Sequence, residues 1–280
     1  MPPLALPTSE TPRVSILVVA ARHGHLLRAC LQALARFVPA ELSWELIVLL
    51  NRADADVADA ARQVAGLRLA STDADLGLAG GLNRASAMAR GELLVMLHDD
   101  TEVEAGWLEG LLEAAAKHGE AGAVGSWVRN MDGSNQYLGA VLWQDGTTAL
   151  NGPGIRSGIF AVDYTGSSSM LVRRRTWDAV GGASEEFFPA VYVDVDLALK
   201  IWARGEAVLV NQASHLLHRR SGSMTPELRE VLYRRNRARL VEKWPDRLAD
   251  QEPADPSRAA LERALERAAA RWRRCGGLVS

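Results

Sequence analysis

Two adjacent carboxylates at the end of an apolar run are the residues of this chain best suited to chemistry. Residues 93–97 are uninterrupted apolar side chains, and they lead through His98 to Asp99 and Asp100. Such a run suits a strand buried on both faces of a sheet, and open α/β sheets bind ligands at the carboxyl ends of their strands. Neighbouring carboxylates repel each other, and a divalent cation would relieve that repulsion. The pair therefore indicates a metal or ligand site.

The same residues also fit the start of a helix. Asp100 or Thr101 would then cap the helix N-terminus, with Glu102 and Glu104 in the first turn, where acidic side chains interact favourably with the helix dipole. Taken alone, this segment supports either interpretation.

The first 120 residues alternate between strand-like and helix-like patterns. Apolar runs predict strands over residues 14–20, 45–50, 67–71 and 93–97. Apolar residues at helical spacing predict helices over residues 26–37, 56–64, 82–89 and 107–118. This alternation is typical of an α/β protein with a doubly wound, mostly parallel, Rossmann-like sheet.

The second half of the chain is less regular. Residues 123–164 are rich in glycine and predict short strands and loops, where a substrate-specific surface could lie. Further elements are predicted over residues 170–172, 174–180, 195–203 and 208–210, followed by helices over 226–244 and 256–274. The last helix places apolar side chains on one stripe with arginines elsewhere; the stripe is Leu261, Leu265, Ala268 and Trp272.

The composition is that of a globular protein. The 280 residues are 48% hydrophobic and 24% charged with a net charge of −2, so nucleic-acid binding is not expected. The two cysteines, Cys30 and Cys275, have no metal-ligand spacing and fit a reducing compartment. The apolar run over 14–21 is too short to span a bilayer, and we expect a cytoplasmic protein. The proline-rich residues 1–12 are expected to be disordered.

Four segments, in order, resemble the GT-A glycosyltransferases of family 2, inverting enzymes that use nucleotide-sugar donors. Residues 14–22 resemble the first strand of that family, and residues 75–85 (Asp-Leu-Gly-Leu-Ala-Gly-Gly-Leu-Asn-Arg-Ala) resemble its glycine-containing loop. Residues 89–101 resemble its Ala-x-Gly-Glu strand and metal-binding acidic motif, and residues 166–205 resemble its acceptor half. The likeness is greatest to the rhamnosyltransferase-like branch.

The resemblance implies a GT-A fold with an acceptor-side α+β extension and C-terminal helices. The GT-A domain would cover residues 13–224, divided into a nucleotide-sugar-binding half (13–120) and an acceptor half (121–224). Residues 225–280 would form a helical extension.

The resemblance also implies a divalent metal, Mg²⁺ or Mn²⁺. It assigns the metal to Asp100, with Asp99 nearer the ribose or sugar of the donor. His98 stands where the family usually has Asp or Asn, and it could donate to the ribose or bind the metal. His218, followed by Ser221 and Ser223, fits the histidine that completes the metal site better than His215 does.

The donor side is implied in the same way. The loop after the third strand would pack against the base and ribose of the nucleotide-diphosphate sugar. Its expected donor-contacting residues are Asp75, Gly77, Gly80 and Asn83. Ala20, Arg22 and Asn51 follow or end the first two strands and are expected on the same side.

The catalytic base implied by the resemblance is Asp194. An inverting transfer needs a base that takes the proton of the acceptor hydroxyl as this attacks the anomeric carbon. Val193 replaces the glutamate that usually precedes this aspartate, so Asp194 is the only carboxylate at that point. Capping of the helix over 195–203 is the structural alternative for Asp194, and it is compatible with catalysis.

The function implied is transfer of a sugar from a nucleotide-diphosphate sugar to a glycan, lipid-linked or secondary-metabolite hydroxyl, as in cell-wall or polysaccharide biosynthesis. Leu50 replaces the aspartate with which the family reads the donor base, so a non-catalytic nucleotide-sugar-binding scaffold is an alternative. A nucleotide-sugar pyrophosphorylase is a weaker one. The arginine-rich C-terminal helix leaves open peripheral contact with the inner face of the plasma membrane, and a homodimer is also open.

Overall fold

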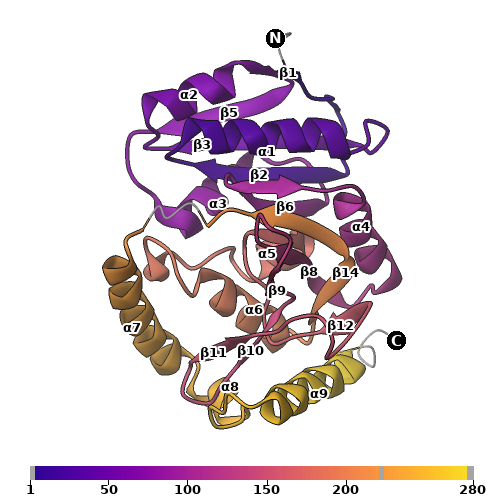
Figure 1. Ribbon diagram of the computed structural model, residues 1–280, viewed down its shortest axis with the longest axis vertical. Helices are drawn as coiled ribbons and strands as arrows, with labels where there is room; N and C mark the ends of the chain where they lie inside the picture. Colours follow the sequence, from indigo (N-terminus) through magenta and orange to yellow (C-terminus); the bar gives the residue numbers. More distant parts are fainter. Residues whose placement is uncertain (1–3, 221–223, 276–280) are drawn as a thin grey trace.

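A ten-stranded sheet forms the centre of the described chain. The computed structural model describes residues 4–220 and 224–275. The strands of the sheet are β2 (Val14–Ala20), β3 (Trp44–Asn51), β5 (Leu67–Thr72), β6 (Leu93–His98), β7 (Thr101–Val103), β8 (Ala121–Arg129), β9 (Asn135–Tyr137), β12 (Ile159–Ala161), β13 (Ser169–Arg173) and β14 (Ala207–His218). Their order is β12-β14-β8-β13-β6-β2-β3-β5, with β7 paired to β14 and β9 to β8 (Figure 1).

The N-terminal half is doubly wound, as the sequence predicts. The four strands β6, β2, β3 and β5 are parallel, and the helices between them are α1 (Gly24–Phe37), α2 (Ala55–Arg62) and α3 (Gly77–Met88). The chain moves outward from β2 to β5 and then returns to β6, so right-handed crossovers place α1 and α2 on one face and α3 on the other. The carboxyl ends of β2 and β6 therefore form the switch point where such sheets bind ligands.

The second half continues the sheet. Here β13 is antiparallel to β6 and β8, and β14 runs parallel to β8. The other elements of this half are α4 (Trp107–Lys117), β10 (Ala140–Leu142), β11 (Thr148–Leu150), α5 (Arg174–Ala179), the 3₁₀ turn η1 (Glu185–Phe187) and α6 (Val193–Ala203).

The irregularity predicted for residues 123–164 is wrong at its start, because β8 is a nine-residue central strand. Its glycines serve close packing rather than turns. A Cβ on Gly125 would lie only 1.9 Å from the Thr165 hydroxyl oxygen.

One predicted helix start is also wrong. Helix α3 begins at Gly77 rather than residue 82, because the Asn51 side chain accepts from the Leu76 amide (2.9 Å) and the Asp75 carboxylate accepts from the Gly77 amide (2.9 Å). The start predicted for the next helix is confirmed, since α4 begins at Trp107, and the capping alternative for residues 100–104 therefore fails. Residues 101–103 instead form β7, which pairs with the end of β14.

The N-terminal segment is more ordered than expected. Residues 1–3 lie outside the described part of the chain, but β1 (Leu4–Ala5) pairs in parallel with β4 (Val64–Ala65). The Leu6 side chain is buried, with 5% of its surface exposed. Burial of this side chain and the strand pairing together outweigh the local preference for disorder.

Three C-terminal helices line the outer edge of the acceptor half: α7 (Pro226–Lys243), α8 (Pro245–Ala249) and α9 (Arg258–Cys275) (Figure 1). Leu265 and Ala268 of the apolar stripe are buried in the domain's own core. Arg267 and Arg271 face the buried Asp163 carboxylate at 2.7 and 3.6 Å. The stripe is therefore used for packing within the domain. In the described ranges, no helix has the length and apolarity needed to cross a bilayer.

Candidate functional site

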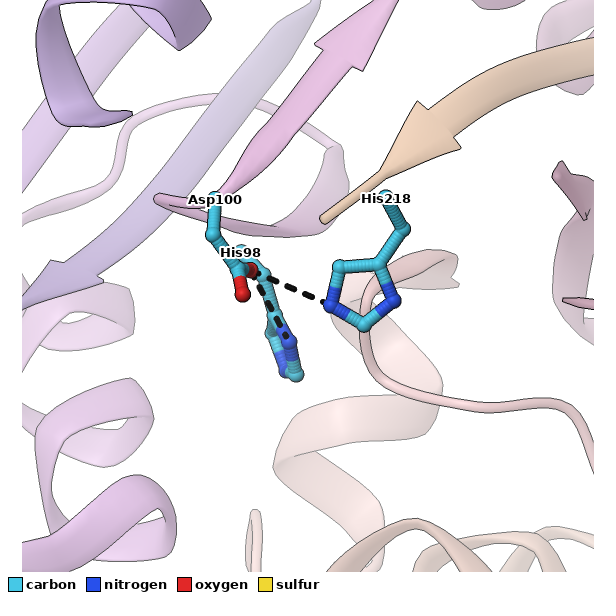
Figure 2. Close-up of side chains that lie close together, drawn as sticks. All are labelled: His98, Asp100 and His218. Carbon is cyan, nitrogen blue, oxygen red and sulfur yellow. Dashed lines mark ion pairs between the residues drawn. The ribbon is translucent and has the colours of Figure 1, made fainter. Parts of the chain in front are cut away.

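The site begins at the switch point, where β6 ends. Asp99 and Asp100 form the turn between β6 and β7, and β7 pairs with the last residues of β14 so that Thr101 faces His218. This pairing brings the end of β14 to the acidic turn. Figure 2 shows the result, in which side chains from two strand ends point at one another.

His98, Asp100 and His218 form a compact cluster. The Oδ1 atom of Asp100 lies 3.1 Å from Nε2 of His218 and 3.9 Å from Nδ1 of His98. One ligand atom from each of the three lies within 4.8 Å of the others. Imidazole nitrogens and a carboxylate oxygen at such spacing fit a divalent transition metal.

The hydrogen bonds behind His218 favour the form that binds metal. Gln136 donates from Nε2 to the Asn130 side-chain oxygen (2.9 Å) and to the His218 carbonyl (3.0 Å), so its Oε1 is the atom that faces His218 Nδ1 at 2.9 Å. Oε1 can only accept, and His218 therefore carries its proton on Nδ1. Nε2 is then the nitrogen that faces the Asp100 carboxylate and would bind a cation held between them.

His98 is suited to the same role. Desolvation, and secondly the nearby His218, lower the pKa of His98 to about 4, against the opposing effect of Asp100. The imidazole is therefore neutral at physiological pH, which is the state that ligates metal. Its Nε2 lies 3.2 Å from the Ser167 hydroxyl.

Asp99 lies on the other side of the turn. Burial, followed by the charge of Asp100, raises the pKa of Asp99 to about 7, although its carboxylate accepts a hydrogen bond from the Ala21 amide. Asp99 thus points to the end of β2, the side on which the sequence expects the donor. Asp99 and Asp100, adjacent in the chain, are therefore divided between two sides of the switch point.

Asp194 lies in the first turn of α6, after the N-cap residue Tyr192. Its carboxylate accepts from the Ser167 amide (3.3 Å) and the Val195 amide (3.0 Å). Burial nevertheless raises the pKa of Asp194, because desolvation outweighs these hydrogen bonds. The alternative in which Asp194 caps the helix is wrong, because the N-cap residue of α6 is Tyr192.

A single cavity of about 340 Å³ brings these groups together. His98, Asp100, His218 and Asp194 all line it. The remainder of its wall includes Arg220, which the sequence places where it could reach the diphosphate, and side chains that the sequence analysis did not select as site residues: Leu78, Gln136, Tyr164, Ser167 and Arg229. The sequence signal for Arg220 was its position close behind His218.

Several residues expected at the donor do not line this cavity. Asn83 donates to the Ala183 carbonyl and the Glu185 carboxylate and accepts from the Ala183 amide, so its amide is used in joining α3 to the acceptor half. Asn51 and Asp75 bind each other (3.2 Å) and the start of α3. None of these three lines the cavity.

The other residues expected at the donor lie at the end of β2 and at the start of α3. Ala20 is fully buried at the end of β2, and Arg22 is exposed just beyond it. Gly77 and Gly80 lie in the first turn of α3 rather than in a loop. A Cβ on Gly77 would lie 2.6 Å from the Pro189 carbonyl oxygen, so this glycine permits close approach of the backbone of the acceptor half.

Of the two candidate metal-binding histidines, His218 lies in the cluster and His215 does not. His215 Nδ1 lies 2.9 Å from the Glu104 carboxylate, which also accepts from Arg129, and His215 does not join the cluster. Ser221 and Ser223, which follow His218 in the pattern, lie outside the described residues. Among the aromatic residues between 123 and 164, Tyr137 lines the cavity, whereas Trp143 is buried and Arg129 stacks on Trp127.

Comparison with known proteins identifies a glycosyltransferase family and several relatives. The model of the family described as glycosyl transferase family 2 matches residues 15–176. Protein y4gI of Sinorhizobium fredii is 30% identical over 279 residues, covering 92% of this chain and 30% of the relative. The N-acetylglucosaminyl-diphospho-decaprenol L-rhamnosyltransferase of Mycobacterium tuberculosis is 28% identical over 194 residues, covering 59% of this chain and 62% of the relative. The O-antigen biosynthesis protein RfbC of Myxococcus xanthus is 30% identical over 154 residues, covering 50% of this chain and 12% of the relative.

Solved structures share the fold. GalNAc-T7 with UDP, GalNAc and Mn²⁺ superposes with a TM-score of 0.69 at 14% identity, covering 86% of this chain and 50% of that one. The mannosyltransferase PcManGT of Pyrobaculum calidifontis, in complex with GDP-Man and Mn²⁺, gives 0.61 at 19% identity, covering 99% of this chain and 79% of that one. At these identities the likeness shows the fold, which is GT-A.

Proposed function

The chain belongs to glycosyltransferase family 2, and on that premise we propose that it is a metal-dependent, inverting enzyme whose cavity holds both the metal and the catalytic base. The observation that carries the proposal is the placement of the His98, Asp100 and His218 cluster and of the Asp194 carboxylate in the wall of one cavity. Both similar structures contain Mn²⁺, which supports the proposal of a metal in this protein.

Asp100, His218 and His98 would hold the metal, and their neutral imidazoles leave its charge available to the donor. A divalent metal in this place would neutralise the diphosphate leaving group as a Lewis acid. Arg220 lines the same cavity, has no ion pair with any described residue and would add a second positive charge for phosphate. Arg219 is directed elsewhere, since it pairs with Glu102 at 3.2 Å.

Asp194 would accept the proton of the attacking hydroxyl. Its raised pKa makes it a stronger base than an ordinary aspartate, while the amides of Ser167 and Val195 hold the carboxylate in place. Asp194 and the metal cluster line the same cavity, so the base and the metal could act on one bound donor and acceptor. Val193, where the family usually has Glu, is buried and leaves Asp194 without a neighbouring carboxylate.

For the substrates, we propose a donor of the nucleotide-diphosphate-sugar class and an acceptor hydroxyl on a glycan or lipid-linked saccharide. The relatives named for O-antigen biosynthesis and for rhamnosyl transfer to a diphospho-decaprenol support a polysaccharide acceptor. Because the chain spans 30%, 12% and 62% of the three relatives' lengths, these substrates are proposals for this domain. Tyr137 and Tyr164 offer ring faces in the cavity against which a sugar could stack.

The proposal is tested by the stereochemistry of the product. The protein would be incubated with Mn²⁺ and a panel of donors (dTDP-rhamnose, UDP-GlcNAc, GDP-mannose), together with lipid-linked and free saccharide acceptors. NMR of the product gives its anomeric configuration. Inversion relative to the donor supports the proposal, and retention of configuration or full activity in EDTA contradicts it.

A further inference from the structure

The segment that leads into Asp194 has an unusual backbone. This segment, the strap, comprises residues 188–192 between η1 and α6. Val191 and Tyr192 have φ of 71° and 70°, in the left-handed region that side chains other than glycine rarely adopt. The β-branched Val191 is especially unsuited to it. Contacts from elsewhere in the fold must therefore hold the strap in this conformation.

Asn236 of α7 supplies most of those contacts. Its side chain is fully buried, and its Nδ2 atom donates to the carbonyls of Phe187 (3.2 Å), Ala190 (2.8 Å) and Val191 (2.8 Å). A carboxamide nitrogen has two hydrogens, so the three carbonyls share them. No apolar side chain could replace these bonds.

The preceding residue of α7 completes the attachment. The Arg235 guanidinium donates from Nε to the Asn236 side-chain oxygen (3.0 Å) and from Nη2 to the Phe188 carbonyl. The amide is thus oriented with Nδ2 facing the strap. Two consecutive residues of α7 therefore satisfy four carbonyls at and just before the strap.

The opposite side of the strap rests on the donor half. The Leu78 amide donates to the Pro189 carbonyl at 2.7 Å, at the start of α3. The strap is held between α3 and α7, and Ala190, Val191 and Val193 line the cavity beside Asp194. Its backbone thereby sets where the first turn of α6, and with it the carboxylate of Asp194, stands in the cavity.

We propose that Asn236 is a positioning residue for catalysis: it fixes the strap so that Asp194 meets the acceptor hydroxyl. This inference rests on the proposed role of Asp194. Asn236 touches no substrate, and it acts through the strap. Its loss is therefore expected to affect the chemical step much more than binding of the donor.

The experiment uses the full chain. Asn236→Leu keeps a similar side-chain volume and removes the donors, and Leu240→Ala, one turn later on the buried face of α7, controls for weakened packing of that helix. For Asn236→Leu we expect kcat to fall by about 10- to 100-fold, because small misplacements of reacting groups cost rate on that scale. The donor KM and the thermal stabilisation by nucleoside diphosphate with Mn²⁺ should stay within about twofold of wild type, since these contacts do not change. Leu240→Ala should lose stability and keep its kcat. Equal kcat in the two variants overturns the proposal.

A milder pair covers the case in which Asn236→Leu does not fold. Arg235→Ala removes one strap contact and the orientation of the Asn236 amide, whereas Arg234→Ala removes only the exposed pair with Glu230 at 2.7 Å. We expect a few-fold loss of kcat in Arg235→Ala and none in Arg234→Ala, and equal values overturn the proposal.

The attachment of the strap by Asn236 can also be tested without an activity assay. Hydrogen exchange of the amides over residues 188–194 should be faster in Asn236→Leu than in Leu240→Ala. Absence of activity in the wild type would count against the proposed function alone, whereas equal exchange in the two variants would count against the role of Asn236.

Discussion

The Nε2 atom of His218 lies 3.1 Å from Oδ1 of Asp100, although one residue ends β14 in the second half of the chain and the other follows β6 in the N-terminal half. The contact depends on β7, which pairs with the end of β14 immediately after the acidic turn. A cation placed here would therefore tie the two halves of the domain together across the cavity.

Replacement of the proposed base is the first prediction. Asp194→Asn keeps the size of the side chain and its place in α6 but removes its basicity. We expect kcat to fall by about 10²- to 10⁴-fold, the range typical of a lost general base, with nucleoside diphosphate binding unchanged. Initial rates and a thermal-shift titration of the same preparation check this. A variant with more than about a tenth of wild-type kcat would exclude Asp194 as the base.

A second prediction concerns pH. Burial raises the pKa of Asp194, so the carboxyl stays protonated to a higher pH than an ordinary aspartic acid. The base must be unprotonated to act, and activity should therefore rise with pH through that raised pKa, giving an acid limb above the range of an exposed aspartate. The pH profile of kcat measures it. An acid limb at the pKa of an ordinary aspartate, or the same limb in Asp194→Asn, would show that another group controls the rate.

Gln136 supplies a third prediction, because its side-chain oxygen fixes the proton of His218 on Nδ1. Gln136→Leu preserves volume and removes that acceptor. Affinity for Mn²⁺ should fall by about 10- to 100-fold, as is usual when the hydrogen-bond partner of a ligating histidine is lost. Isothermal titration with Mn²⁺ gives the value. His215→Gln, outside the cluster, is the control and should bind as wild type does; equal affinity in both variants would refute the role of Gln136.

The sequence predicted well the parts of the fold that local patterns determine. Continuous apolar runs located β2, β3 and β6, since strands buried on both faces need them. The start of α3 was missed because Asn51 and Asp75 cap it from outside the helix. β8 was missed because glycines that serve tight packing, such as Gly125, resemble glycines that serve turns.

Some residues of the candidate site could be predicted from the sequence, and others could be found only from the tertiary structure. The apolar run and its two carboxylates pointed to Asp99 and Asp100, and the family resemblance assigned the metal to Asp100 and preferred His218 to His215. The structure places Asp100 and His218 side by side. Gln136 and Ser167 carry no local signal, because only the tertiary fold brings them to the cavity: Gln136 through the pairing of β9 with β8, and Ser167 from the segment before β13. Asn83 lies in a recognisable motif, and its hydrogen bonds to Ala183 and Glu185 could not be read from one sequence.

The fourth prediction concerns stability. Asp163 is 2% exposed, accepts from Arg267 at 2.7 Å and from the Leu142 amide at 3.0 Å, and faces Arg271. Asp163→Asn would leave two partly buried arginines without their carboxylate, and we expect a loss of about 3–5 kcal/mol in the free energy of unfolding. Urea denaturation measures it. Glu266→Gln, at the exposed pairs with Arg156 and Arg273, should leave the midpoint unchanged. A midpoint for Asp163→Asn equal to that of the control would show that the anchoring of α9 does not depend on this carboxylate.

The most direct measurement is the thermal stabilisation of the protein by UDP, dTDP, GDP and ADP, each with and without Mn²⁺, in wild type, Asp100→Ala and His218→Ala. Stabilisation follows the logarithm of ligand saturation, so a real site shows as a concentration-dependent shift. We predict that at least one nucleotide stabilises the wild type strongly with Mn²⁺ and weakly without it, and that both variants lose the metal-dependent part. A nucleotide shift that is independent of Mn²⁺, or one that both variants keep, would contradict the assignment of the metal to this cluster.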